Sequence, residues 1–173
     1  MSHFVMHALL GYLWCFSRVF IRAASGRKRF NVLGALDPFT FDIFTVTNDS
    51  YINSQSVALL LQDLRARFPE IPITLVMDNA RYQRCRLVMN LAQELRIELL
   101  FLPPYSPNLN LIERFWKFVK KQCLHAAYYD SFELFQSAIT DCINGSKTVH
   151  RQELNSLLTL NFQTFDNVNL ICT

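Results

Sequence analysis

A short apolar run, Ile73 to Met77, lies between two segments with helical spacing and ends at the polar pair Asp78-Asn79. A run of this length and character is typical of a central strand that is covered on both faces of its sheet. The segments Ser54–Arg67 and Arg86–Leu95 carry apolar residues at the spacing of an amphipathic helix, and Ile97–Leu102 is a second strand-like run. This part of the chain therefore predicts alternating helices and strands.

The N-terminal part of the chain has a different pattern, rich in apolar, aromatic and β-branched residues. Strand-like runs extend over Phe4–Phe16, Val19–Ala23, Phe30–Leu36 and Ile43–Thr47, and Asp37-Pro38 lies where a hairpin connection is expected. Hairpin strands followed by strand–helix alternation predict the α/β fold class, with a mixed sheet flanked by helices in a ribonuclease-H-like order.

Two more amphipathic helices are expected after the alternating part. The prolines of Pro103–Pro107 exclude a helix or a central strand there, and helical spacing returns at Leu111–Leu124 and Asp130–Ile143. A chain of 173 residues predicts one domain, over residues 1–145, with residues 146–173 as a C-terminal tail packed on the domain or extending it.

The composition excludes several classes of protein. Hydrophobic residues make up 51% of the chain and charged residues 18%, which indicates an ordered globular protein. Five cysteines without a C-x-x-C pair favour reduced thiols over a disulfide framework. The apolar run Phe4–Phe16 is shorter than the roughly 18 residues of a membrane span, so no membrane association is expected. The formal net charge of +3 is only a weak indication of an anionic partner.

Asp78 follows its apolar run directly, at the carboxyl end of the predicted strand. In open α/β sheets, ligands bind outside the carboxyl ends of the strands. The alternative is structural, because Asp78 could cap the next helix, with Asn79 sharing that role. Position alone slightly favours the structural interpretation.

Glu113 lies near the start of the helix predicted at Leu111–Leu124. An apolar stripe covers one side of that helix, and Glu113 falls on the opposite side together with Lys117 and Lys120. Two structural explanations are open, an ion pair between Glu113 and Lys117 and a capping box with Asn110. On the residues alone, these explanations are favoured.

The functional interpretation is that Asp78 and Glu113 together bind Mg²⁺ or Mn²⁺ at the edge of the sheet. Phosphodiester chemistry requires hard oxygen ligands, and Mg²⁺ keeps several waters and uses few protein carboxylates. Two such ions can activate an attacking oxygen and stabilise a leaving one. Under this interpretation Lys117, Lys120 and Lys121 contact the phosphates of DNA.

Two longer stretches of sequence carry these acids, Val76–Tyr82 (VMDNARY) and Leu102–Trp116 (LPPYSPNLNLIERFW). Together they resemble the DDE transposases of the mariner-like superfamily, and most closely the bacterial insertion-sequence branch. In that family a "DNA" strand end is followed by LPPYSP-x-LN-x-IE at the start of a helix. The family's second aspartate and final glutamate are separated by 34 residues, as Asp78 and Glu113 are here. Further stretches that resemble this branch are Ser25–Leu36 and Val46–Asn53.

The resemblance implies a ribonuclease-H-like catalytic domain and cut-and-paste DNA transposition. Asp78 matches the family's second catalytic aspartate and Glu113 its final glutamate, so both are expected to be catalytic and to bind the metal. The implied chemistry is metal-dependent hydrolysis of a DNA strand, followed by attack of the freed 3′-hydroxyl on target DNA. The implied partners are transposon ends and target DNA, and a second copy of the chain in a homodimer. The implied location is the cytoplasm of a bacterium, in association with the nucleoid.

The sequence departs from the family at its N-terminal end. Ser2–Val5 matches the segment that follows the family's first catalytic aspartate, so that aspartate would fall directly before Met1. The aspartate, the first strand that carries it and the family's helix-turn-helix DNA-binding region are therefore expected to be missing. Asp37, Asp42 and Asp49 match other positions, and none of them is expected to replace it. With an incomplete triad, the chain is expected to be a remnant or one frame of a transposase encoded in two pieces.

Several other residues are candidates for contact with DNA. The basic turn Arg27-Lys28-Arg29 either contacts phosphates or forms a solvated hairpin tip. Arg81 follows the Asp78-Asn79 turn and could reach a phosphate of the substrate. Trp14 and Trp116 each lie in an apolar run, so both are expected in the core and not as platforms for bases.

Three functions follow from these observations. The leading hypothesis is a transposase catalytic domain that is impaired by the missing aspartate. The second is a catalytically dead remnant that still binds DNA or dimerises. The third is another metal nuclease of the same fold, which the proline-rich loop and the spacing disfavour. Metal-dependent strand cleavage separates the first and third from the second, and strand transfer separates the first from the third.

Overall fold

The computed structural model describes residues 1–6, 14–20, 28–104, 106, 109–125 and 127–162. Its first sheet is an antiparallel meander of three strands, β1 (Ser2–Met6), β2 (Lys28–Leu36) and β3 (Ile43–Asn48), with β2 in the centre. The connection between β2 and β3 lies at Asp37-Pro38, where the sequence predicts a hairpin connection.

The alternating part of the chain forms a second, parallel sheet with two helices. Its elements are α1 (Ser54–Arg67), β4 (Ile73–Met77), α2 (Arg86–Glu94) and β5 (Ile97–Phe101), close to the predicted bounds. Ile73 and Leu75 of β4 pack into a core with α1 and α2, whereas Thr74 and Val76 on the other face are exposed. The expectation that β4 is covered on both faces is therefore wrong, because α1 and α2 lie on the same face of the strand.

Three further helices follow the proline-rich loop. They are α3 (Leu111–Leu124), α4 (Phe132–Asn144) and α5 (Arg151–Leu157), with a short 3-10 helix, η2 (Gly145–Lys147), before α5. α4 begins later than expected because Ser131, and not Asp130, caps it, with the Ser131 hydroxyl accepting the Leu134 backbone N–H at 3.2 Å. Among the described residues, no helix has both the length and the apolar character that a membrane span requires.

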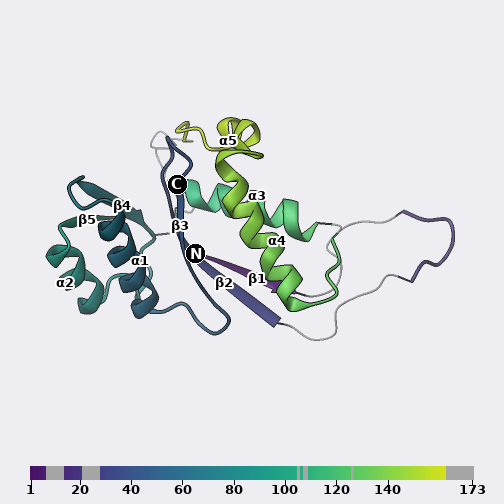
Figure 1. The fold of residues 1–173 in the computed structure, drawn as a ribbon, viewed down its shortest axis with the longest axis horizontal. Helices are drawn as coiled ribbons and strands as arrows, with labels where there is room; N and C mark the ends of the chain where they lie inside the picture. Colours follow the sequence, from purple (N-terminus) through teal and green to yellow (C-terminus); the bar gives the residue numbers. More distant parts are fainter. Residues whose placement is uncertain (7–13, 21–27, 105, 107–108, 126, 163–173) are drawn as a thin grey trace, which may run out of the picture.

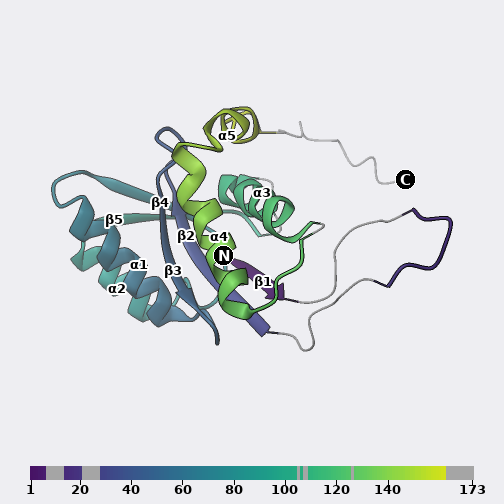
Figure 2. The same ribbon diagram turned by 45° about the vertical axis from the view of Figure 1, so that its right-hand side comes forward.

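Figures 1 and 2 show α1 and α2 on one side of the sheets and α3, α4 and α5 on the other. Alternate side chains of β2 point to opposite faces of the sheet. Phe30 and Val32 pack with α3 and α4, whereas Leu33 and Ala35 pack with α1. The sequence predicts one mixed sheet. Within the described residues the antiparallel and parallel parts are instead two separate sheets, and α1 contacts both β2 and β3 as well as α2.

The two tryptophans have opposite environments. Trp116 of α3 is 1% exposed and lies so close to β2 that a Cβ at Gly34 would come 2.9 Å from its Cζ2 atom. Its predicted place in the core is confirmed. Trp14 is 95% exposed, in a segment that Figure 1 shows at the far right, away from the helices and sheets. The prediction that Trp14 lies in the core is wrong, because its apolar run continues beyond β1 to where no helix or strand of the described residues covers it.

The strand-like runs predicted at Phe4–Phe16 and Val19–Ala23 are only partly described. β1 ends at Met6, and the described residues between Trp14 and Phe20 form no strand. The remaining parts of both runs, residues 7–13 and 21–23, lie outside the described residues.

Part of the predicted C-terminal tail packs into the first core. Leu154 of α5 is fully buried and Leu158 is nearly so, and both belong to the cluster formed by β1, β2, α3 and α4. The structure therefore places Leu154 and Leu158 of the predicted tail in the core shared with the helices that precede them.

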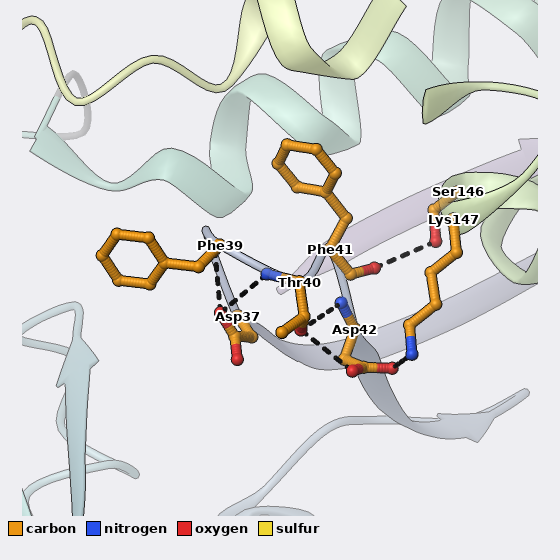
Figure 3. Close-up of polar contacts among 7 residues, drawn as sticks. All are labelled: Asp37, Phe39, Thr40, Phe41, Asp42, Ser146 and Lys147. Atoms are coloured by element: carbon orange, nitrogen blue, oxygen red, sulfur yellow. Dashed lines mark hydrogen bonds and ion pairs between the residues drawn. The ribbon is translucent and has the colours of Figure 1, made fainter. Parts of the chain in front are cut away.

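The start of this tail holds the turn between β2 and β3 (Figure 3). The Ser146 hydroxyl donates to the Phe41 carbonyl at 3.2 Å, and the Lys147 ammonium forms an ion pair with the Asp42 carboxylate. The hydrogen bond from Lys147 holds the pKa of Asp42 below its ordinary value. Phe41 has a φ of 61°, an unusual backbone conformation for a non-glycine residue. The hydrogen bond to the Phe41 carbonyl and the ion pair at Asp42 hold the turn in this conformation.

Candidate active site

Asp78 lies at the carboxyl end of β4, where the strand leads into a loop. The Leu102 backbone N–H donates to the Met77 carbonyl at 2.9 Å, so the β4–β5 pairing extends to the residue before Asp78. The Asn110 side-chain amide donates to Asp78 Oδ1 at 2.8 Å. The alternative role of Asp78 as a helix cap is contradicted, because α2 has Cys85 at its N-cap position and no side-chain cap bond.

Glu113 lies in the first turn of α3 and is half-buried. Neither structural explanation from the sequence applies to it. Within the described part of the chain, Glu113 forms no ion pair with Lys117, and Asn110 caps the helix through Ile112 without a capping box. Its carboxylate is therefore not used by the helix that carries it.

The fold brings Asp78 and Glu113 together in one pocket of about 560 Å³. Its other walls come from the residues after Asp78 and from the proline-rich loop: Asn79, Ala80, Leu102, Pro103, Pro104 and Ser106. Pro103 and Pro104 each have a fixed φ, so the backbone conformation of this part of the wall is restricted. Two carboxylates that are distant in sequence thus share one concave site at the end of a strand.

The Met1 amino group lies beside the same two carboxylates. Its nitrogen is 3.8 Å from Glu113 Oε1. Burial lowers the pKa of this amino group, and the charges of Glu113 and Asp78 oppose that decrease. The pKa of the nearby Tyr82 hydroxyl is raised, first by burial and then by Asp78 and Glu113. The charges of both acids therefore act on one small region of the structure.

The donor chemistry of the pocket fits a hard divalent cation with few protein ligands. Mg²⁺ is commonly bound by one or two carboxylates, with water or substrate phosphate in the other positions. Asp78 and Glu113 are the residues that would hold such an ion. Among the described residues, no group of three or more His, Cys, Asp or Glu side chains could hold a metal ion, so the described part of the chain contributes two carboxylates to this pocket.

Asn110 has a role that the sequence analysis did not assign. Its Oδ1 accepts the Ile112 backbone N–H at 3.3 Å, which caps α3, while its Nδ2 donates to Asp78. One buried side chain therefore fixes the start of the helix that carries Glu113 relative to Asp78. An asparagine just before a helix signals a cap, but its second bond spans 32 residues and depends on the tertiary fold.

Replacing Asn110 by serine should separate these two bonds. Serine can still cap α3 but is too short to reach Asp78, so Asn110→Ser should be more stable than Asn110→Ala by about 1 kcal/mol. Both variants should bind Mn²⁺ roughly 10–100-fold more weakly than the unmodified chain, because Asp78 loses its orienting partner. Urea denaturation and calorimetric Mn²⁺ titration measure the two effects. Unchanged Mn²⁺ affinity in Asn110→Ser would contradict the orienting role.

The predicted DNA-contacting residues on α3 differ in their surroundings. Lys117 and Lys120 are exposed, and helical geometry places them on the same side as Glu113. Lys121 also is exposed, but its Nζ lies 3.9 Å from Glu153 of α5. Lys117 and Lys120 are thus directed toward the side of the candidate site, whereas Lys121 is directed toward α5.

The other predicted contacts lie on two further segments. Lys28 and Arg29 are exposed at the start of β2, and Lys28 Nζ is 5.5 Å from the centre of the Phe132 ring. Arg81 is exposed in the loop that follows Asp78. Arg27, the first residue of the predicted basic turn, lies outside the described residues.

Comparison with known proteins was made for the sequence and for the fold. The family described as DDE superfamily endonuclease matches residues 17–136. The fold is similar to the Mos1 transposase paired-end complex with left transposon end, with a TM-score of 0.59 and 15% identity over 94% of this chain and 55% of that chain. It is also similar to the Mos1 strand transfer complex, with a TM-score of 0.66 and 16% identity over 91% of this chain and 48% of that chain. No curated protein matches.

A third similar structure is the catalytic core domain of BIV integrase, with a TM-score of 0.53 and 20% identity over 71% of this chain and 77% of that chain. These likenesses confirm the predicted ribonuclease-H-like α/β fold. The chain spans about half the length of the Mos1 chains in the two complexes. The family match includes Asp78 and Glu113 and begins after β1.

Proposed function

We propose that this chain, which belongs to the DDE superfamily endonuclease family, is the catalytic domain of a DNA transposase of the mariner-like superfamily, in its bacterial insertion-sequence branch. It hydrolyses a phosphodiester of a DNA strand in a metal-dependent reaction, and the freed 3′-hydroxyl then attacks a phosphodiester of target DNA, which forms a new O–P bond and releases a 3′-hydroxyl end of the target strand. Its activity is low, because two carboxylates stand in the site in place of three. The observation that carries this proposal is the meeting of Asp78 and Glu113 in one pocket at the end of β4.

The residues of the pocket have distinct parts in this reaction. Asp78 and Glu113 would hold Mg²⁺ or Mn²⁺, which would supply charge stabilisation to the attacking and leaving oxygens of the phosphodiester. Asn110 holds Asp78 through Oδ1 and leaves the second carboxylate oxygen for the metal. The Pro103-Pro104 loop forms the fixed wall against which the DNA strand lies.

A carboxylate joined directly before Met1 would complete the site. The Met1 side chain packs on the α1 side of the sheet, with its Sδ 3.7 Å from the Tyr82 hydroxyl. Consecutive residues of a strand point to opposite faces, so a residue bonded to the Met1 nitrogen would point to the α3 side, where Glu113 lies. This geometry supports a site that a carboxylate directly before Met1 completes. An upstream DNA sequence with no Asp codon directly before Met1 in any frame would exclude that completion.

DNA is the proposed partner, both as transposon ends and as target, in the nucleoid of a bacterium. Lys117, Lys120 and Arg81 are exposed on the two segments that carry Glu113 and Asp78. Lysine and arginine side chains at such positions bind phosphates without reading sequence, and that binding weakens steeply as the salt concentration rises. A homodimer, with one copy at each transposon end, is part of the same proposal.

Nicking of a DNA oligonucleotide in Mn²⁺ tests the proposed function. The purified chain should nick weakly, Asp78→Ala should abolish the nicking, and Glu94→Ala should leave it unchanged. Glu94 is the matched control because it is an exposed carboxylate at the end of α2 and does not line the pocket. A second assay should detect joining of a 3′-hydroxyl end to target DNA.

The possible results separate the competing functions. Nicking that survives Asp78→Ala would contradict the proposed site. Absence of nicking by the unmodified chain, with DNA binding retained, would favour the catalytically dead remnant that binds DNA or dimerises. Nicking without strand transfer would favour a metal nuclease of the same fold.

A further inference from the structure

The loop between β4 and α2 carries an arginine that reaches back to the residue after Asp78. Arg84 Nη1 donates a hydrogen bond to Asn79 Oδ1 at 2.9 Å. The backbone allows this contact, because the Gln83 and Arg84 N–H groups donate to the Ala80 carbonyl at 3.0 and 3.2 Å and close a turn. Gln83 is buried, so the middle of this turn is packed against the domain. The sequence analysis considered Asn79 only as a helix cap and assigned no role to Arg84.

An aromatic ring supports the same guanidinium group. The central carbon of the Arg84 guanidinium lies 5.4 Å from the centre of the Phe101 ring. Phe101 is the last residue of β5 and is paired in register with Met77, the residue before Asp78. Because a cation over an aromatic face is attracted by the ring, this contact restricts the direction of the Arg84 side chain. Arg84 therefore links the carboxyl ends of both parallel strands to the side chain of Asn79.

The bond from Arg84 determines which chemical group Asn79 can offer to a ligand. An asparagine amide has an acceptor oxygen and a donor nitrogen, whereas a guanidinium only donates. The atom that faces Arg84 is therefore Oδ1, and among the described residues Nδ2 has no protein acceptor. An oxygen that is already bonded to one cation is a poor ligand for a second one. The N–H groups of Nδ2 suit an anionic oxygen, with which they form charge-assisted hydrogen bonds.

Asn79 lies in the pocket that the two carboxylates share. It lines the same cavity of about 560 Å³ as Asp78 and Glu113. In the described part of the chain no lysine or arginine lines this pocket, and Ser106 is the other lining side chain with a donor. The Ser106 hydroxyl already donates to the Pro104 carbonyl at 3.4 Å. A DNA strand that brings a phosphate to the two carboxylates therefore meets the Asn79 amide as a donor.

We propose that Asn79 binds a non-bridging oxygen of the DNA phosphate in this pocket through Nδ2, and that Arg84 is the positioning residue that orients it. This role rests on the proposed function, because it requires a DNA strand in the pocket. Two adjacent residues then have opposite tasks, since Asp78 would hold the metal cation and Asn79 binds the anion. Arg84 acts through Asn79 and makes no contact with the phosphate itself.

Replacing Asn79 by aspartate separates this role from a structural one. Aspartate has nearly the same size and keeps an oxygen for Arg84, so Asn79→Asp should unfold at a similar urea concentration. It replaces the donor with a negatively charged acceptor, and should weaken DNA binding by at least about tenfold. Asn79→Ala should also bind DNA about tenfold more weakly, with unchanged affinity for Mn²⁺. Fluorescence anisotropy of a labelled DNA oligonucleotide measures DNA binding, and calorimetric titration measures Mn²⁺ binding.

A double-mutant cycle tests the positioning role of Arg84. Arg84→Met cannot donate to Asn79, so it should weaken DNA binding by about as much as Asn79→Ala, whereas Arg84→Lys keeps a donor and should retain most of the affinity. In the Asn79→Ala background, Arg84→Met should cause no more loss than Arg86→Met, because the only remaining effect is the lost charge. Arg86 is the matched control, since it is exposed at the start of α2 and does not line the pocket.

The results decide between the possible roles of these two residues. Weaker DNA binding by both Asn79 variants, and an Arg84→Met loss that depends on Asn79, would support the proposal. Unchanged DNA affinity in Asn79→Asp would overturn it, and so would a lower Mn²⁺ affinity in Asn79→Ala, because Asn79 would then be a metal ligand. Losses that add in the double variant would contradict the positioning role, since Arg84 would then contact DNA by itself.

The same measurements separate this proposal from the proposed function. An unmodified chain that binds DNA without nicking it would contradict the proposed activity and leave the binding role of Asn79 standing. A chain that nicks DNA, with equal DNA affinity in all Asn79 variants, would overturn the role of Asn79 alone. An unmodified chain that does not bind DNA would overturn both.

Discussion

An aspartate placed directly before Met1, at the end of a five-residue extension whose other four residues alternate valine and threonine, is expected to raise Mn²⁺-dependent DNA nicking on the order of 10²-fold. The residue at that position points to the α3 side of the sheet, where Glu113 lies, and it is bonded to the Met1 nitrogen, which is 3.8 Å from Glu113 Oε1. A third carboxylate there increases the affinity for the metal and fixes its position relative to Asp78. The initial rate of oligonucleotide nicking, measured at several Mn²⁺ concentrations, separates tighter binding from a faster reaction.

The asparagine form of the same extension is the control for this experiment. It has the same length as the aspartate form but lacks the negative charge, so it should nick no faster than the unextended chain. Combining the aspartate extension with Asp78→Ala should return the rate to background. Equal rates for the aspartate and asparagine forms would contradict a three-carboxylate site at the end of β4.

The candidate acids could be predicted from the sequence because each has a local signal. Asp78 follows an apolar run and Glu113 falls outside an apolar stripe, and the sequence places both correctly relative to their own strand or helix. Local pattern could not decide between a structural and a functional role. That decision depended on contacts that the structure shows, namely the absence of a Lys117 pair among the described residues and the shared pocket.

Features that depend on two distant segments could not be predicted. The bond from Asn110 to Asp78 joins the start of a helix to the end of a strand. The lack of a hydrogen-bond partner for Gln83 Oε1 among the described residues depends on the segments packed around it, and not on its neighbours in sequence. The division into two sheets also escaped prediction, because strand-like runs identify strands but do not identify which edges meet.

The two tryptophans show the same point for single side chains: the local sequence does not determine which segment covers a residue. Both lie in apolar runs, and the sequence predicts that both are in the core. The run around Trp116 has helical spacing, so its apolar side has a fixed direction and packs against β2. The run around Trp14 has no such spacing beyond the end of β1, and its side chain is exposed. Periodicity, and not apolar content alone, therefore indicated burial correctly.

Trp116→Ala is expected to lower the free energy of unfolding by about 3–5 kcal/mol. The ring is 1% exposed and packs edge-on against Phe4 of β1, with ring centres 6.2 Å apart, and beside Phe115, with ring centres 5.3 Å apart. It also packs over Gly34, where an added Cβ would come 2.9 Å from the Trp116 Cζ2 atom. Loss of the indole therefore leaves a void between the first sheet and α3, and urea denaturation followed by circular dichroism measures the cost.

Two variants test whether the loss of stability expected for Trp116→Ala comes from packing. Trp14→Ala, at a 95% exposed position, should change the free energy of unfolding by less than about 0.5 kcal/mol. Trp116→Phe keeps an aromatic ring and removes an indole N–H that has no partner among the described residues, so it should cost less than about 1.5 kcal/mol. If Trp116→Phe proved as destabilising as Trp116→Ala, the indole N–H would have to form a bond in solution, and packing against Gly34 and Phe4 would not be the main contribution of this residue.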